Sequence, residues 1–177
     1  MTCTIVSMGE ELTLVCKNEH EAPYPEIKAR LHEKIWMLYC KGYDRFCVNC
    51  EYGVPLWCAE IIIALRLYND IELNIAMPYE EQSTNWIEEY RDRFFAVHTE
   101  ADHVEIISPH YTEECYERAD EYMIDNSDLL LIVCKKRIVT HCLKYAADSG
   151  VSVEFFEIKK CHKFLQFTAR SKYVLYV

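Results

Sequence analysis

The chain has 177 residues, a length typical of one globular domain, and 51% of them are hydrophobic. This composition excludes an intrinsically disordered chain and supplies enough apolar surface for a core. The formal net charge is −10, and an acidic protein repels phosphate backbones, so we do not expect nucleic acid as a partner. No run of about 18 apolar residues occurs, and no basic segment precedes an apolar run at the N-terminus, so we expect neither a membrane span nor a signal peptide.

Ten cysteines are the most unusual feature of the composition. They are scattered along a chain that is long enough to fold without disulfides, so we expect reduced thiols and a cytoplasmic location. Cys47 and Cys50 form a CxxC pair, but a second pair of this kind, which a zinc site commonly uses, is missing. We therefore expect no metal and no cofactor. Most of the cysteines are interpreted as small core residues, and only Cys50 is kept as a candidate for chemistry.

Short apolar or β-branched runs alternate with stretches of helical periodicity. Pro25 begins a first helical pattern, which Gly42 ends. An unbroken run, LLLIVC, suits a strand that is covered on both faces. In chain order the pattern predicts strand 2–8, helix 25–42, strand 45–49, helix 55–67, strand 71–77, helix 84–101, strand 103–108, helix 112–125 with Thr112 as its N-cap, strand 129–134, helix 138–149 and strand 151–158.

This alternation predicts an α/β fold, a three-layer Rossmann-like doubly wound domain with a mainly parallel sheet, because parallel neighbours need long crossover connections. We assign residues 1–158 to this domain. Residues 159–177 hold two β-rich runs and are expected to form a C-terminal β extension of the same domain. That extension is either a hairpin that continues the sheet or an arm that pairs with another subunit, so a homo-oligomer is possible.

Charge is distributed unevenly along the chain. Residues 79–128 hold 15 acidic and 3 basic side chains, whereas residues 158–177 hold 5 basic and no acidic ones. We interpret the first segment as a solvated acidic face and the second as a surface for packing or self-association, rather than as a nucleic-acid site.

In open doubly wound sheets, ligands bind outside the carboxyl ends of the strands. This rule selects the segments that follow five of the predicted strands, residues 7–9, 49–53, 78–82, 108–111 and 134–137. They are the places where we expect functional side chains.

The order of several motifs resembles one known family. GVPLWCAEIIIAL is followed by ELNIAMPYEEQSTNW, by ADHVEIIS, by ERADEYMIDNSDLLLIV and by HCLKYAADSGVSVEFFEI. This series resembles the YpsA-like family of the SLOG superfamily, a Rossmann-like group that also includes the LOG phosphoribohydrolases and DprA. The resemblance covers roughly residues 42–158, and AMPYEEQSTNW is its most specific part. It implies a nucleotide-derived small molecule as the ligand.

The chain departs from the resembled family at its glycine-rich turns. Family members carry a GGAxGFD turn after the second strand, on which a phosphate can lie because backbone N–H groups approach it closely. Here that turn aligns to Asn49, Cys50, Glu51, Tyr52, Gly53, Val54 and Pro55, and only Gly53 matches. The family's later GGT turn aligns to Arg137, Ile138 and Val139, and the TGHR-type turn after the first strand is replaced by Ser7, Met8 and Gly9. These replacements indicate impaired or absent catalysis.

Other family positions persist. The resemblance implies that the ligand-binding residues are Tyr79, Gln82, Asn85, Trp86, Arg118, Asn49, Cys50, Gly53 and Glu60. Arg118 matches the arginine of the family's Arg-Asn pair, with Ala119 in place of the asparagine. The glutamate that serves glycosidic cleavage in the LOG branch has no counterpart after Val139.

Each retained position also has a structural interpretation. Tyr79 and Trp86 are residue types that commonly pack in cores. Gln82 and Asn85 are suitable caps for the helix predicted at 84–101. Arg118 can pair with Glu114 or Glu121 at helical spacing, and Glu60 can simply be solvated.

Three functions remain open at this stage. The first is a ligand-binding or regulatory domain that holds a nucleotide-like molecule without turnover. The second is a protein-interaction or self-association module that has lost nucleotide binding. The third is an enzyme, either related to phosphoribohydrolases or dependent on Cys50. The missing glycines favour the first two, and the intact motif at residues 79–86 favours the first.

Overall fold

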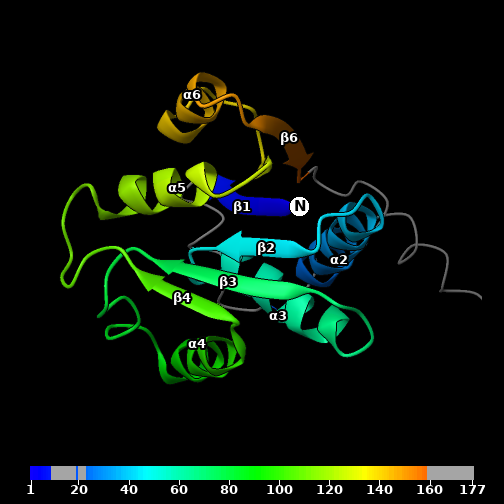
Figure 1. Ribbon diagram of the computed structural model, residues 1–177. Coiled ribbons are helices and arrows are strands. Elements are labelled where there is room, and N and C mark those ends of the chain that lie inside the picture. The colour runs from blue at the N-terminus through cyan, green and yellow to red at the C-terminus, as the bar shows by residue number, and fades with distance from the viewer. Residues whose placement is uncertain (9–18, 20–22, 159–177) are drawn as a thin grey trace, which may run out of the picture.

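The structure, a computed structural model, describes residues 1–8, 19 and 23–158. One six-stranded sheet runs through the described part, with the strand order β4-β3-β2-β1-β5-β6 and parallel pairing throughout (Figure 1). The strands are β1 (Thr2–Met8), β2 (Arg45–Val48), β3 (Glu72–Met77), β4 (His103–Ile106), β5 (Leu129–Cys134) and β6 (Ser152–Glu157). The helices are α2 (Tyr24–Cys40), α3 (Val54–Arg66), α4 (Glu88–Glu100), α5 (Cys115–Asp125) and α6 (His141–Asp148).

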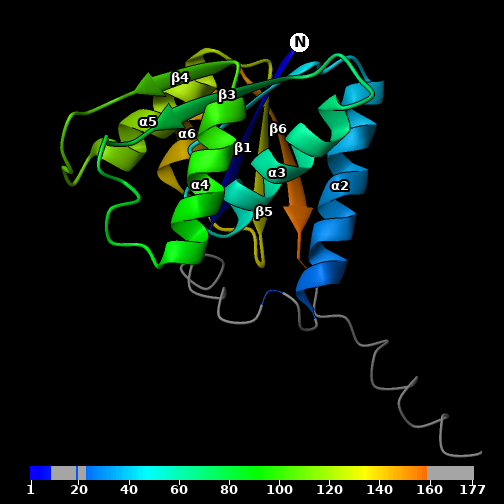
Figure 2. The ribbon, with the colours of Figure 1, turned by 90° about the horizontal axis from the view of Figure 1, so that it is seen from below.

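Helices cover both faces of the sheet. Helices α2, α3 and α4 lie on one face, and α5 and α6 lie on the other (Figures 1 and 2). The larger group of buried side chains, which includes Phe46 and Trp57, packs beneath the first three helices. A smaller group, which includes Met123 and Cys142, packs beneath the other two. The predicted doubly wound α/β architecture is therefore confirmed.

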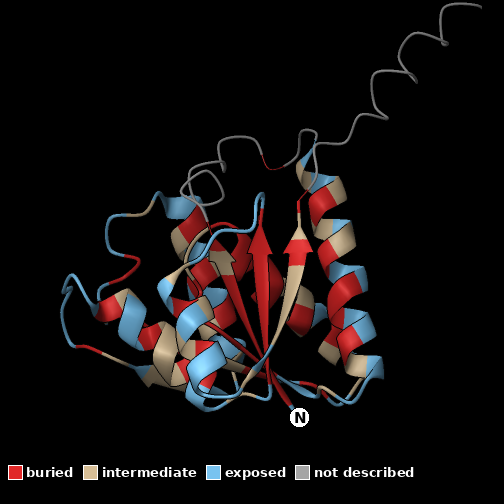
Figure 3. Ribbon diagram, turned by 90° about the horizontal axis from the view of Figure 1, so that it is seen from above, coloured by how far each residue is buried: buried red, intermediate tan, exposed pale blue. Residues whose placement is uncertain are grey.

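Strand β5 lies in the interior of the sheet, between β1 and β6. All six of its residues are buried (Figure 3), as the unbroken apolar run predicts. Its register with β1 runs from Cys3 opposite Leu129 to Met8 opposite Cys134. The chain builds β1 to β4 outward on one side of β1 and then places β5 on the other side, so the direction of winding reverses between β1 and β5.

Helix α2 illustrates how local sequence sets the element. Ile27, Leu31, Ile35 and Leu38 recur at helical spacing and are buried against the sheet. Pro25 lies in the first turn, where its missing N–H is not needed. Gly42 follows the helix with a φ of +96°, which favours glycine because it has no Cβ.

Three helices begin later than the sequence pattern predicts. Helix α4 begins at Glu88 rather than at residue 84, because the backbone before it forms turns in which Thr84 N–H donates to Glu81 and Trp86 N–H to Ser83. Helix α5 begins at Cys115, so Thr112 is not its N-cap. Helix α6 begins at His141, after Thr140, whose hydroxyl accepts a hydrogen bond from Leu143 N–H.

The C-terminal β extension predicted for residues 159–177 lies outside the described residues. Within the described part, no helix is both long and apolar enough to cross a membrane.

Candidate functional site

The turn between β2 and α3 holds the residues that align with the family's first glycine turn. Its backbone is fixed by Asn49, whose side-chain Oδ1 accepts a hydrogen bond of 3.1 Å from Glu51 N–H. Gly53 is the N-cap of α3 and has a φ of +98°, so this turn retains its glycine where the backbone requires one. The turn lies at the carboxyl end of β2, where this class of sheet binds ligands.

Cys50 occupies a glycine-like backbone conformation in the same turn. Its φ of +52° is the only positive value for a non-glycine residue in the described part of the chain. The side chain is 0% exposed and belongs to the core. Burial raises the pKa of its thiol far above the usual range, so the thiolate that a nucleophile needs is disfavoured. The structure thus places the Cys50 side chain away from solvent, although the turn that carries it lies at the ligand edge.

Gln82 joins the loop after β3 to the turn after β2. Its side-chain Nε2 donates a hydrogen bond of 3.1 Å to the backbone carbonyl of Asn49. The side chain is only 2% exposed, and its Oε1 has no hydrogen-bond partner among the described residues. Gln82 is therefore not a cap of α4. Its position at the carboxyl ends of two neighbouring strands agrees with the expected site.

Two carboxylates and three tyrosines gather at this edge of the sheet, and we call them the acid–tyrosine cluster: Glu51, Tyr79, Tyr111, Tyr116 and Asp120. The Tyr79 ring lies between the rings of Tyr111 and Tyr116, with centroid distances of 5.4 Å and 6.2 Å. The cluster combines the turn after β2, the loops after β3 and β4, and the first two turns of α5.

The two carboxyl groups of the cluster are unusually hard to ionise. Burial raises the pKa of Glu51 to about 7. Burial raises the pKa of Asp120 to about 7 as well, and the negative charge of Glu51 contributes to that rise, while His141 opposes it. Neither carboxylate forms a hydrogen bond or ion pair with a described residue. Titratable groups that are poised near neutral pH and lack a partner are typical of functional sites.

Several members of this cluster are absent from the residues that the sequence selected. Tyr116 and Asp120 were not selected, and Glu51 and Tyr111 were selected only as parts of the strand-end segments 49–53 and 108–111. One signal was available, because Tyr116 and Asp120 are four residues apart on α5 and so lie on one face of the helix. Nothing in the linear sequence connects that face with Glu51.

Trp86 and Glu60 have structural partners. The Trp86 ring packs edge to face against Tyr52 and Phe94, at centroid distances of 5.2 Å and 5.4 Å. The Glu60 carboxylate accepts two hydrogen bonds from Arg93 of α4, of 2.6 Å and 2.8 Å. Glu60 is thus not merely solvated, since it ties α3 to α4.

Arg93 also binds Glu19, and together with Lys28 and Glu60 these residues form a network that we call the Glu19 clamp. Glu19 has a side chain that is 5% exposed, and its Oε2 lies 2.5 Å from Lys28 Nζ and 3.0 Å from an Arg93 guanidinium nitrogen. Burial alone would raise the Glu19 pKa, but hydrogen bonds from Arg93 and Lys28 overcome it and hold the pKa at about 2. The clamp fastens the connection between β1 and α2 to three helices.

Arg118 and Asn85 are exposed. The Arg118 guanidinium forms no ion pair with a described residue, so the predicted pairing with Glu114 or Glu121 is not observed. Buried positions on α5 are Cys115, Ala119, Met123 and Ile124, and Arg118 lies outside that stripe. The structure does not bring Arg118 into the cluster.

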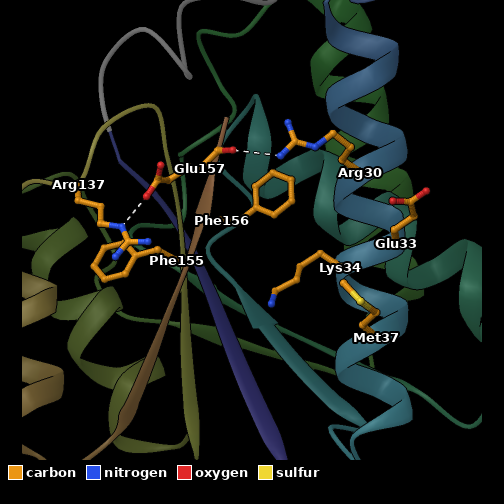
Figure 4. A pocket seen from close by; sticks show the side chains of 8 residues that line it. All are labelled: Arg30, Glu33, Lys34, Met37, Arg137, Phe155, Phe156 and Glu157. Atoms are coloured by element: carbon orange, nitrogen blue, oxygen red, sulfur yellow. Dashed lines mark hydrogen bonds and ion pairs between the residues drawn. The ribbon is translucent and has the colours of Figure 1, made fainter. Parts of the chain in front are cut away.

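A groove of about 410 Å³ lies between α2 and β6 (Figure 4). It is lined by Arg30, Glu33, Lys34, Met37, Arg137, Phe155, Phe156 and Glu157. Its cations already have partners, because Arg30 donates to the Glu157 backbone carbonyl, Arg137 to the Glu157 carboxylate, and Lys34 to Glu154. We therefore do not assign an anion site to this groove.

The described cysteines form no disulfide, and seven of these eight are buried. Burial raises the pKa of the Cys47 and Cys58 thiols to about 12. No group of histidine, cysteine, aspartate and glutamate suited to a metal ion occurs in the part of the chain that the structure describes. Cys161 and the rest of the basic tail lie outside that part.

Comparison with known proteins connects this architecture to one family. Residues 10–154 match the family model YpsA, described as the YspA SLOG family. The chain is 32% identical over 123 residues to UPF0398 proteins of Bacillus cereus strains B4264 and ATCC 14579, and 31% identical over 123 residues to a UPF0398 protein of Bacillus thuringiensis strain Al Hakam. Each match covers 67% of this chain and 66% of the relative, so the chain spans slightly less than two thirds of these relatives. The chain therefore belongs to the YpsA-like family of the SLOG group.

Proposed function

We propose that this protein binds a nucleotide-derived ligand at the carboxyl edge of its sheet and acts as a sensing or regulatory domain without turnover. One observation carries the proposal. Glu51, Tyr79 and Asp120 come from three separate elements at the edge where doubly wound sheets bind ligands, and burial, together with the charge of Glu51, raises the pKa of both other groups. The raised pKa values of the two carboxyl groups support this edge as the proposed ligand site, because perturbed titratable groups are frequent at such sites.

The absence of turnover is proposed from the β2–α3 turn. A phosphate-binding turn needs backbone N–H groups that an anion can approach. Here Cys50 adds a buried side chain, and Glu51 adds a carboxyl group in the position next to it. Arg118, which matches the family's arginine, is exposed on α5, and its guanidinium forms no ion pair with a described residue. These features support binding through the nucleoside part of a ligand more than attack on a glycosidic bond beside a bound phosphate.

The experiment is a thermal-shift series on the full chain with AMP, ADP-ribose and NAD. A compound present at 100 times its Kd stabilises the folded state by about 2.7 kcal/mol. We expect at least one compound to raise Tm, and we expect Tyr79→Phe and Asp120→Asn to reduce the shift. Tyr68→Phe is the matched control, because Tyr68 is 89% exposed at the opposite end of α3 from the turn that carries Glu51.

Two results would contradict the proposal. If none of the three compounds raises Tm at millimolar concentration, the nucleotide-binding role is wrong. If free base is released from AMP at a rate that depends on Glu51, the protein is an enzyme and the absence of turnover is wrong.

A further inference from the structure

The charge balance of the acid–tyrosine cluster is incomplete. Glu51 and Asp120 are both half-buried, and each lacks an ion-pair partner in the described part of the chain. The His141 side chain opposes the rise that burial causes in the pKa of Asp120, but its Nε2 lies 2.7 Å from Glu121 Oε1, so this ring already has another carboxylate as its partner. Two half-buried carboxylates in one site are unfavourable unless a proton or a cation compensates them.

The surroundings of the cluster add to this negative charge. Exposed carboxylates flank it in the loops after β3 and β4 and on α5, at Glu80, Glu81, Glu113, Glu114 and Glu117. Such a field repels phosphate and raises the local concentration of cations. The end of a ligand that enters the cluster is therefore expected to be its positively charged end.

The tyrosines supply a second, independent attraction for a cation. The Tyr79 ring packs edge to face against the rings of Tyr111 and Tyr116, at centroid distances of 5.4 Å and 6.2 Å. The face of an aromatic ring attracts cations, and aromatic side chains beside carboxylates are a recurrent way of binding organic ammonium groups. A hydrated metal ion gains less from such rings than an organic cation does.

Gln82 contributes a third observation. Its Oε1 is a buried acceptor without a described partner, and its amide nitrogen holds the turn that carries Glu51. Together with the two carboxylates, it adds a third hydrogen-bond acceptor to this edge of the sheet. Buried acceptors of this kind require donors from elsewhere.

We propose that the acid–tyrosine cluster binds the cationic end of an organic ligand, either a protonated amine or a pyridinium-type ring, between the Glu51 and Asp120 carboxylates. This inference rests on the proposed function and names the chemical class of the group that the site recognises. A neutral nucleoside of the same shape binds less tightly, because it leaves the two carboxylates uncompensated.

Binding of a cation is coupled to proton release. Near neutral pH each of the two carboxyl groups is protonated in a fraction of the molecules, because both pKa values are raised to about 7. A cation binds the ionised forms and expels those protons. The other titratable groups that act on the pair include Tyr79 and Tyr116, Glu117 and Glu121 on α5, and His141 and Cys142 on α6. The affinity for the cation is therefore expected to rise with pH.

The test uses isothermal titration calorimetry on the full chain with two probes of nearly identical shape. Nicotinamide riboside carries a pyridinium cation, and its reduced dihydro form is neutral. We expect the cation to bind at least about tenfold more tightly at pH 8, corresponding to about 1.4 kcal/mol. We also expect its affinity to fall between pH 8 and pH 6, and proton release to appear as a buffer-dependent heat in Tris and PIPES at pH 7.

Variants separate the cluster from the general acidity of the protein. Glu51→Gln and Asp120→Asn are expected to abolish the preference for the cation, whereas Glu33→Gln, which removes an exposed carboxylate on α2, is expected to leave it unchanged. Far-UV circular dichroism and urea titration confirm that each variant is folded.

Equal affinity for the two ribosides, or no binding of either, overturns the cation site. The thermal-shift series with AMP, ADP-ribose and NAD decides the proposed function separately. NAD is the compound in that series that carries a pyridinium cation, so NAD that binds equally well to the wild type and to Glu51→Gln would leave nucleotide binding in place and refute only the cation site.

Discussion

Replacement of Glu51 by glutamine is expected to stabilise the protein, in contrast to most substitutions of half-buried residues. The Glu51 pKa is raised from 4.5 to about 7 in the folded state. The folded state therefore holds a proton between these pH values that the unfolded state has lost, so stability decreases as pH rises through this window. Because each pH unit between these two pKa values is equivalent to about 1.4 kcal/mol, the ionised carboxylate lowers the free energy of unfolding by about 3 kcal/mol at pH 8.

The effect is measured by urea unfolding of the wild type and of Glu51→Gln at several pH values. We expect the variant to be more stable by about 1 kcal/mol at pH 5 and by about 3 kcal/mol at pH 8. Glu33→Gln, at an exposed position of α2, should change stability by less than about 0.5 kcal/mol at both pH values. A gain for Glu51→Gln that is the same at pH 5 and pH 8, or a loss at pH 8, would refute the idea that an uncompensated carboxylate strains this site.

Three further predictions concern the Glu19 clamp and the cysteines. Glu19→Gln should lower the free energy of unfolding by about 2–3 kcal/mol at pH 7, because the Glu19 pKa is lowered to about 2. This contribution is fully present above pH 4.5 and disappears as pH falls through about 2. Urea titrations that give the same loss at pH 7 and at pH 3 would contradict the prediction. Cys50→Gly should be more stable than Cys50→Ala by about 1 kcal/mol, because φ at this position is +52°. At Cys58, inside α3, the alanine variant should instead be more stable than the glycine variant by about 1 kcal/mol. If urea unfolding gives the same order at both positions, the backbone at Cys50 is unstrained. Among the eight described cysteines, exposed Cys40 should react first with iodoacetamide in the native state, and peptide mapping by mass spectrometry that finds Cys50 or Cys58 labelled earlier would be inconsistent with their burial.

The fold follows from features that can be read locally. The LLLIVC run predicts a strand covered on both faces, and β5 has this property at all six positions. Long helical stretches between strands predict parallel pairing, which the sheet confirms. Helix starts were less accurate, because the turns at residues 84–87 have a composition that also suits a helix.

The candidate site was only partly predictable. The resemblance selected Tyr79, which lies in the cluster, and Gln82, which joins its loops, because a strand end is recognisable in the sequence. It also selected Arg118, which is two residues from Tyr116 and therefore about 200° away around the helix. Whether such a residue faces the sheet depends on the rotation of α5, which is set by tertiary packing.

Glu51 and Asp120 show a further reason for the incomplete prediction. They are 69 positions apart in sequence, and only the order of the strands brings them together. Glu60 was selected as a ligand-binding residue, but its carboxylate binds Arg93 on the next helix of the chain, a partner that the local sequence does not indicate. A side chain that looked available for a ligand is used to join two helices.

The hydrogen bond from Gln82 to the Asn49 carbonyl also has a kinetic consequence. The Asn49 side chain in turn holds Glu51 N–H, so the loop after β3 and the turn after β2 are joined in series. Opening of either segment breaks the support of the other, and the two are expected to exchange their amide hydrogens as one cooperative unit. A ligand that contacts only the loop after β3 would then also slow hydrogen exchange in the turn after β2, although it does not touch that turn.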